Sequence, residues 1–259
     1  MHRFLILNNT ILIPMYNLLI GIGTILGFLF LENQIKVRNI KFNTDRNIYF
    51  SIIISGFFVF LGAKFFELLY KQSNFNLQAL LSSGITFYGG LIFGLISFFI
   101  INKLFKTDNN VAFNLVIPSL ILFHGFGRIG CFFAGCCYGK PTDLFFGVTY
   151  PEGIIPTKYL GSSIKLHPVQ LYEAFFLFLL FFIIVKFISF EMRTAAYFLI
   201  YSLSRFFIEF LRDDYRGKFL TENLFPSQTM SIIFFFIGVL LILKSKIISK
   251  MISIKIRIR

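Results

Sequence analysis

The chain has 259 residues, of which 56% are hydrophobic and only 14% are charged, and its formal net charge is +13. Its mean hydropathy is +0.77, whereas soluble domains are roughly 45–50% apolar and about 25% charged. This composition excludes a single soluble domain. Because the basic residues are spread over separate segments, the positive charge does not indicate a nucleic-acid-binding protein.

Seven apolar runs predict seven membrane-spanning helices, since each run is long enough to cross a hydrocarbon layer of roughly 30 Å. The expected spans are Ile11–Leu31, Ile48–Tyr70, Ile85–Ile101, Ala112–Arg128, Leu171–Phe187, Thr194–Arg212 and Gln228–Leu243. We therefore expect an all-α, polytopic membrane protein in which residues 1–259 form a single integral membrane domain. No small-residue cleavage site lies between the first apolar run and the next charged stretch, which favours an uncleaved helix over a signal peptide.

Basic residues alternate along the chain in the way that sets the orientation of membrane proteins. Lys and Arg cluster in residues 32–47, 102–111, 186–193 and 244–259. Segments enriched in Lys and Arg face the cytoplasm. We therefore expect the N-terminus outside and the C-terminus in the cytoplasm.

The second predicted span contains charged residues, and the third contains a stripe of glycines. Lys64 and Glu67 lie one turn apart in the outer third of the second span, either as a neutralising ion pair or as part of a functional site. The third span has a stripe of small residues formed by Gly84, Gly89, Gly90 and Gly94. This stripe favours close helix packing, and room for a lipid tail is the alternative.

The connection between the fourth and fifth spans, residues 129–170, is the one sizeable loop of the predicted topology, and it is rich in Gly, Pro and Thr. Loops of this length are usually functional. We expect it on the outer face, where it could hold a substrate peptide.

Charged side chains in the sixth span predict a site in the outer half of the membrane. Counting outward at 1.5 Å per residue, Arg205 lies near the midplane, Glu209 roughly 6 Å further out and Arg212 near the outer boundary. Spacings of four and three keep all three on one helix face. Charges inside a span cost about 2.5–3.5 kcal/mol each on insertion scales, so they mark functional positions by default.

Other spans place polar residues at the same depth. Arg128 closes the fourth span, and His124 lies one turn before it. The fifth span opens with His167, Gln170, Tyr172 and Glu173. Two arginines with one carboxylate between them would leave positive charge, which favours an anionic ligand such as phosphate. The alternative is a set of ion pairs that only tie helices together.

Three motifs carry a family resemblance. The stretch Gly127-Arg128-Ile129-Gly130-Cys131-Phe132 resembles the Gly-Arg-x-Gly-Asn-Phe core of bacterial prolipoprotein diacylglyceryl transferases. Two further segments match in the expected order, His167–Glu173 and Arg205–Arg212. The resemblance implies transfer of the diacylglyceryl group of phosphatidylglycerol to the lipobox cysteine of a preprolipoprotein, with a thioether formed and glycerol phosphate released.

The resemblance also implies a place and a set of partners. The protein is expected in the bacterial inner membrane with its active site toward the periplasmic or outer face. Its partners would be the lipid bilayer, phosphatidylglycerol, and the signal peptide and lipobox of the preprolipoprotein, with no nucleic acid. Neither a metal nor an organic cofactor is implied.

Residue roles follow from the matching positions. Arg128 and Arg205 would bind the phosphate and stabilise the leaving group, with Glu209 orienting Arg205. The remaining matched residues would contact substrate: Gly130, Cys131, Arg212, His167, Gln170, Tyr172 and Glu173.

The chain departs from the family pattern at two positions. Tyr88 stands where the family has a His that is assigned to activation of the thiol, and Cys131 stands where the family has Asn. His124 could supply the imidazole from another helix, or it could be a packed His. Tyr88 could instead donate a hydrogen bond to the lipid.

The cysteines leave two alternatives open. Cys131, Cys136 and Cys137 would suit a membrane thiol-redox protein on the oxidising side, although their spacing is not C-x-x-C. Zinc binding by these cysteines and His124 is disfavoured because a fourth ligand is not evident. A diverged lipid- or peptide-binding protein on the same scaffold is the second alternative.

Overall fold

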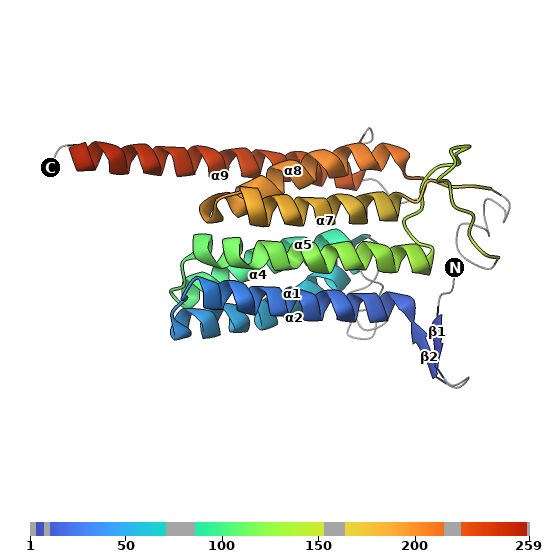
Figure 1. Ribbon diagram of the computed structural model, residues 1–259, viewed down its shortest axis with the longest axis horizontal. Helices are drawn as coiled ribbons and strands as arrows, with labels where there is room; N and C mark the ends of the chain where they lie inside the picture. Colours follow the sequence, from blue (N-terminus) through green and yellow to red (C-terminus); the bar gives the residue numbers. More distant parts are fainter. Residues whose placement is uncertain (1–3, 8–10, 71–85, 153–163, 215–223, 258–259) are drawn as a thin grey trace. The chain divides into compact units, whose positions relative to one another are not determined.

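The computed structural model describes residues 4–7, 11–70, 86–152, 164–214 and 224–257, and over these ranges it is mostly helical (Figure 1). The long helices are α1 (Met15–Val37), α2 (Phe42–Tyr70), α4 (Phe87–Leu104), α5 (Asn109–Ala134), α7 (Val169–Phe187), α8 (Arg193–Ile208) and α9 (Pro226–Arg257). Two short 3-10 helices, η1 (Phe190–Met192) and η2 (Glu209–Leu211), flank α8. Within the described ranges, six helical segments are long and apolar enough to cross a membrane, and Gly89–Leu104 of α4 is a shorter apolar helix. The predicted all-α, multi-pass membrane protein is confirmed.

The first span begins four residues later than the sequence predicts. Ile11–Pro14 forms strand β2, which pairs antiparallel with β1 (Phe4–Leu7). Proline has no N–H for helical hydrogen bonding, and β-branched Ile favours extended backbone. Helix α1 therefore starts at Met15, directly after Pro14.

The fourth span ends six residues later than the sequence predicts. Helix α5 continues through Arg128 to Ala134 and stops at Gly135, whose φ is +74°. Gly135 N–H donates to the Phe132 carbonyl at 3.1 Å, and Cys136 N–H donates to the Cys131 carbonyl at 3.2 Å. This pair of bonds is a Schellman motif, in which glycine adopts the left-handed conformation without a Cβ clash. The connection to α7 therefore begins at Gly135 rather than at residue 129.

The chain divides into two compact units, residues 1–33 with 114–259 and residues 34–113. In the second unit, α2 and α4 pack closely through glycines. A Cβ at Gly90 would lie 3.1 Å from the Val59 carbonyl oxygen, and one at Gly89 would meet the Gly62 carbonyl. The packing interpretation of the stripe is confirmed for the described glycines, while Gly84 lies outside the described residues.

Polar contacts also join α2 to α4. The Ser51 hydroxyl donates to Asn102 Oδ1 at 3.0 Å, and the Thr86 hydroxyl donates to Glu67 Oε2 at 2.6 Å. Lys64 is buried, with its ammonium 5.4 Å from the ring centre of Phe60.

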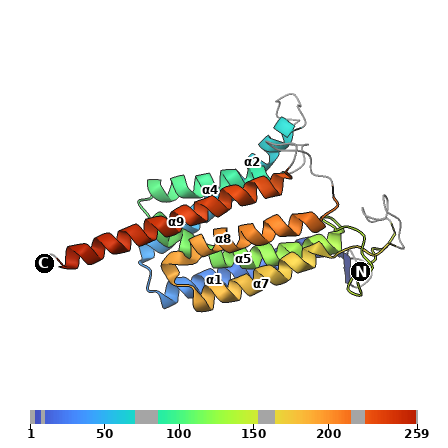
Figure 2. The same cartoon turned by 90° about the horizontal axis from the view of Figure 1, so that it is seen from above.

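In the first unit, contacts at glycines and aromatic rings order the helices. The space beside Gly23 of α1 is filled by Phe126 of α5, and the space beside Gly125 of α5 by Phe178 of α7. Helix α8 packs on α9, where the rings of Phe198 and Phe234 stack at 5.3 Å. The N-terminal hairpin and the α5–α7 connection lie at one end of this unit, and α9 runs to the other (Figures 1 and 2).

Asn114 fixes α8 relative to α5 at the end of the unit opposite the α5–α7 connection. Its side-chain oxygen accepts hydrogen bonds from the Thr194 amide at 2.8 Å and from the Thr194 hydroxyl at 2.7 Å. Its side-chain amide donates to the Glu191 carbonyl at 3.3 Å. The first of these bonds satisfies one of the N–H groups at the start of α8, which have no partner within the helix. Together the Asn114 hydrogen bonds set the register in which the charged residues of α8 meet those of α5.

Candidate active site

Helix α5 presents His124 and Arg128 on one face, one turn apart. Arg128 Nε donates to His124 Nε2 at 3.2 Å. A guanidinium has no acceptor, so His124 Nε2 must be the unprotonated nitrogen and the imidazole proton is on Nδ1. The lone pair that a general base would use is therefore directed at Arg128.

Glu173 of α7 is the centre of the site and is fully buried. Its Oε1 accepts a hydrogen bond from the Tyr201 hydroxyl at 2.7 Å and lies 3.0 Å from Arg128 Nη2. Arg205 Nε is 3.9 Å from the same oxygen, and His124 Nε2 is 3.8 Å from it. One carboxylate oxygen thus joins α5, α7 and α8.

Charged residues at the end of α8, in η2 and just after it extend the cluster. Arg205 Nη2 lies 2.7 Å from Glu209 Oε2, and Arg212 Nε lies 4.0 Å from the same oxygen. Arg212 also donates two hydrogen bonds of 3.0 Å to Asp214. Burial raises the pKa of Asp214 to about 6, although Arg212 acts in the opposite direction. The expected alignment of Arg205, Glu209 and Arg212 on one face is observed.

Positive and negative charges balance within the described part of this cluster, so the expected surplus of positive charge is not observed there. Three guanidinium groups face three carboxylates, since Glu173 and Asp214 join Glu209. The cluster is nevertheless incompletely satisfied. Arg205 Nη1 and Glu173 Oε2 are buried and have no hydrogen-bond partner among the described residues. Such groups are rare in native proteins and mark positions where a water molecule or a ligand binds.

The α5–α7 connection folds over the start of α7. Gln170 donates to the Cys136 carbonyl at 2.6 Å and exchanges hydrogen bonds with the Tyr150 hydroxyl. His167 Nδ1 lies 3.2 Å from the Tyr172 hydroxyl, so it braces the first turn of α7. The Lys140 amide donates to the Leu211 carbonyl at 2.8 Å, which ties the connection to η2. Gln170, His167 and Tyr172 therefore support the connection beside the charged cluster.

The three cysteines lie at the end of α5. Their sulfur atoms are all within 4.8 Å of one another. Arg128 Nη1 lies 3.9 Å from Cys137 Sγ. Hydrogen bonds from Cys131 and Cys136, with further help from Arg212 and Arg128, lower the pKa of Cys137. The pKa of Cys136 is raised by its contacts with the other two thiols and by burial.

Comparison with known proteins decides the family. The sequence profile of prolipoprotein diacylglyceryl transferase matches residues 4–244. The chain belongs to the prolipoprotein diacylglyceryl transferase family. One similar relative is the phosphatidylglycerol–prolipoprotein diacylglyceryl transferase of Clostridium tetani, which is 35% identical over 86% of this chain and 90% of the relative's length. Another is the phosphatidylglycerol–prolipoprotein diacylglyceryl transferase 2 of Clostridium perfringens, which is 31% identical over 87% of this chain and 88% of the relative's length. A Staphylococcus haemolyticus transferase is 28% identical over 91% of this chain and 85% of its own.

All three transferase motifs meet at Glu173, but not every expected residue takes part. Gly130 packs against α1, since a Cβ there would lie 3.0 Å from the Tyr16 ring. The side chain of Tyr88 lies outside the described residues. The third motif, Arg205–Arg212, reaches Glu173 through Arg205.

Sequence reasoning missed two members of the cluster. Tyr201 precedes Arg205 by four residues and so shares its helix face, which is a signal that could have identified it. Its ring stacks on Tyr197 at 5.4 Å. Asp214 follows Arg212 by two residues, and only the fold of the chain after η2 brings it back to that guanidinium.

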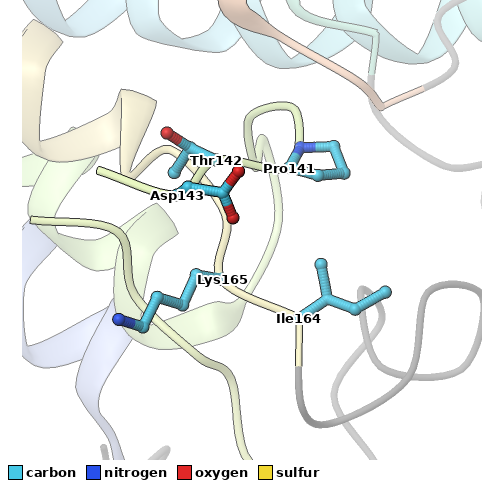
Figure 3. Close-up of a pocket in the computed structure, with 5 residues that line it drawn as sticks. All are labelled: Pro141, Thr142, Asp143, Ile164 and Lys165. Carbon is cyan, nitrogen blue, oxygen red and sulfur yellow. The ribbon is translucent and has the colours of Figure 1, made fainter. Parts of the chain in front are cut away.

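A separate pocket of about 370 Å³ lies in the α5–α7 connection (Figure 3). Its lining is Pro141, Thr142, Asp143, Ile164 and Lys165. Asp143 and Lys165 give it one charge of each sign. No residue of the charged cluster contributes to this lining.

Proposed function

We propose that this protein transfers the diacylglyceryl group of phosphatidylglycerol to the lipobox cysteine thiol of a preprolipoprotein. A bond forms between the cysteine sulfur and the glycerol carbon, the carbon–oxygen bond to phosphate breaks, and glycerol phosphate leaves. Family membership and the names of the relatives support the two substrates. The observation that carries the site assignment is the buried, unpartnered Arg205 Nη1 beside Arg128 and Glu173.

Arg128 and Arg205 would serve the phosphate. The reaction converts a phosphodiester with one negative charge into a departing monoester with up to two. Guanidinium groups aimed at that phosphate stabilise the transition state more than the ground state. Glu173 and Glu209 hold the two arginines before the lipid arrives.

Activation of the thiol requires another group. Forming a thiolate at pH 7 from a thiol of pKa near 8.5 costs about 2 kcal/mol. We assign His124 to positioning Arg128, because its Nε2 accepts from that guanidinium. The buried, unpartnered Glu173 Oε2 is the acceptor that the described cluster leaves free for the thiol proton.

The α5–α7 connection is proposed to hold the signal peptide and lipobox. It follows the end of α5 and is hydrogen-bonded to the start of α7 and to η2, beside the charged cluster. Its pocket, with Asp143 and Lys165, offers contacts for a peptide backbone and polar side chains (Figure 3). In this proposal the site faces outward from the bacterial inner membrane, as the distribution of basic segments predicts.

The test is transfer of labelled diacylglyceryl from phosphatidylglycerol to a lipobox peptide by the purified protein. Arg128→Ala and Arg205→Ala should each lower the rate by roughly 10²–10³-fold, the effect of removing one transition-state donor. Cys136→Ser, just after the end of α5 and outside the charged cluster, is the control and should cost far less.

Two outcomes would contradict the proposal. Absence of thioether product, in lipid where the Clostridium tetani relative is active, would indicate a diverged lipid- or peptide-binding protein. A loss from Cys136→Ser equal to that from Arg128→Ala would favour the thiol-redox alternative.

A further inference from the structure

The end of α5 brings three sulfur atoms together by backbone geometry. The Schellman motif folds Cys136 back over the last turn, where its N–H donates to the Cys131 carbonyl and its thiol lies 3.6 Å from the same oxygen. Neighbouring residues in extended chain point to opposite sides. Cys137 instead has a φ of +62°, a left-handed conformation that is uncommon for a non-glycine residue. It therefore presents its sulfur on the same side as Cys136.

The resulting cluster has the dimensions of a metal site. Three atoms that lie within 4.8 Å of one another also lie within roughly 2.8 Å of a common centre, whereas a zinc–sulfur bond is about 2.3 Å. Each sulfur would need to move inward by only about 0.5 Å, which a change of side-chain torsion supplies. Thiolate sulfur selects soft cations such as Zn²⁺ over Mg²⁺ or Ca²⁺.

We propose that Cys131, Cys136 and Cys137 bind one soft divalent cation of the zinc and cadmium class through their three sulfurs. The family resemblance implied no metal, and a zinc site formed by these cysteines together with His124 was disfavoured. The site proposed here uses the three sulfurs without His124. His124 Nε2 is occupied by Arg128 and is not needed. Three protein ligands leave the fourth tetrahedral position for water or another small ligand.

Charge around the cluster favours this occupant. Three thiolates with one divalent cation carry one net negative charge. Arg128 Nη1, 3.9 Å from Cys137 Sγ, is placed to compensate that charge. The proposal is independent of the transferase proposal, because the three sulfur ligands lie outside the charged cluster and metal binding requires neither lipid nor peptide; Arg128 contacts both.

The experiment is titration of the purified full chain with Cd²⁺ in detergent, with a phosphine as reductant. We expect one Cd²⁺ per chain and an ultraviolet sulfur-to-cadmium charge-transfer band whose intensity corresponds to three cadmium–sulfur bonds. Each of Cys131→Ser, Cys136→Ser and Cys137→Ser should lower the affinity at least tenfold and remove about one third of the band. Ala134→Ser, in the same turn, keeps all three sulfurs and should bind like the unaltered protein.

A second measurement needs no variant. Stoichiometric Zn²⁺ should protect all three thiols of the unaltered protein from maleimide, whereas Mg²⁺ should protect none. Absence of the charge-transfer band, or unprotected thiols at saturating Zn²⁺, would overturn the site. So would isolation of the protein without reductant as a metal-free disulfide between two of these cysteines, which would instead indicate a redox pair. Since the readout is metal binding, its failure leaves the transfer assay unaffected.

Discussion

Glu173 holds the charged cluster together at the level of single residues, because one of its oxygens faces Arg128, Arg205 and Tyr201. The sequence places this residue in the first turn of a helix with no indication of its partners. Its carboxylate is buried between α5, α7 and α8, where it joins the three helices and holds the charged side chains of the site. Two guanidinium groups would be left without their shared counter-charge if it were neutral.

Glu173→Gln should therefore lower stability and activity together. Breaking a buried ion pair from one side costs about 3–5 kcal/mol, since the other charge remains buried. Thermal unfolding in detergent and the transfer assay measure the two effects. Glu152→Gln is the matched control, because Glu152 is exposed. An unchanged melting temperature in Glu173→Gln would show that the cluster does not support the fold.

His124 is predicted to position Arg128 rather than to remove a proton. In His124→Gln the amide oxygen can still accept from Arg128 Nε, so most activity should remain. In His124→Ala the acceptor is lost, and the rate should fall by at least tenfold. The transfer rate as a function of pH separates the roles: equal inactivation of both variants, with loss of a titration near neutral pH, would identify His124 as a base.

Cys137 is predicted to be the most reactive of the three thiols. Its pKa is lowered by hydrogen bonds from Cys131 and Cys136, so its thiolate persists as the pH falls below the ordinary range for Cys. Cys136, whose pKa is raised, stays protonated. Mass-spectrometric mapping of brief maleimide labelling at about pH 6, with a chelator present, should find Cys137 modified first. Faster modification of Cys136 would contradict this order.

At the level of elements, close helix packing depends on where glycines have neighbours. In the second unit, a Cβ at Gly89 of α4 would meet the Gly62 carbonyl of α2. Gly56, also on α2, is exposed and has nothing within 4 Å of its Cβ position. The two glycines are the same residue type in similar helices but differ in what surrounds them.

Gly89→Ala should destabilise the protein by about 1–3 kcal/mol, because the helices must separate to admit the methyl group. Gly56→Ala should be neutral or stabilising by up to about 1 kcal/mol, since alanine is the better helix former. Thermal unfolding of the two variants under the same detergent conditions measures the difference. Equal melting temperatures would contradict the packing of α2 on α4.

For the whole molecule, the number of helices and the alternation of basic segments predict an orientation. The C-terminal tail after α9 should lie in the cytoplasm, and the α5–α7 connection outside. A green fluorescent protein fused after Arg259 should fluoresce, because it matures on the cytoplasmic side. Alkaline phosphatase fused after Glu152 should be active and the same enzyme fused after Lys106 inactive. The reverse pattern of activities would place the transfer site on the cytoplasmic face.

The sequence by itself determined the class of protein and the family. Apolar runs indicate membrane spans directly. Each span must form its backbone hydrogen bonds within its own helix and present apolar side chains to lipid, whatever its neighbours are. The three motifs identified Arg128, Glu173, Arg205 and Glu209 of the cluster without their partners, but not Tyr201 or Asp214. Segment ends were less accurate, since Pro14 and Gly135 act through local conformation that an apolar run does not reveal.

Tertiary structure decided which of these residues meet. The pairing of Glu173 with two arginines, the return of Asp214 to Arg212 and the convergence of three sulfurs all join positions by geometry rather than by pattern. Hydrophobicity is a property of each segment by itself, and so it can be determined from the sequence alone. Charge pairing and hydrogen bonding depend on distances of about 3 Å between different segments, which only the packed chain fixes.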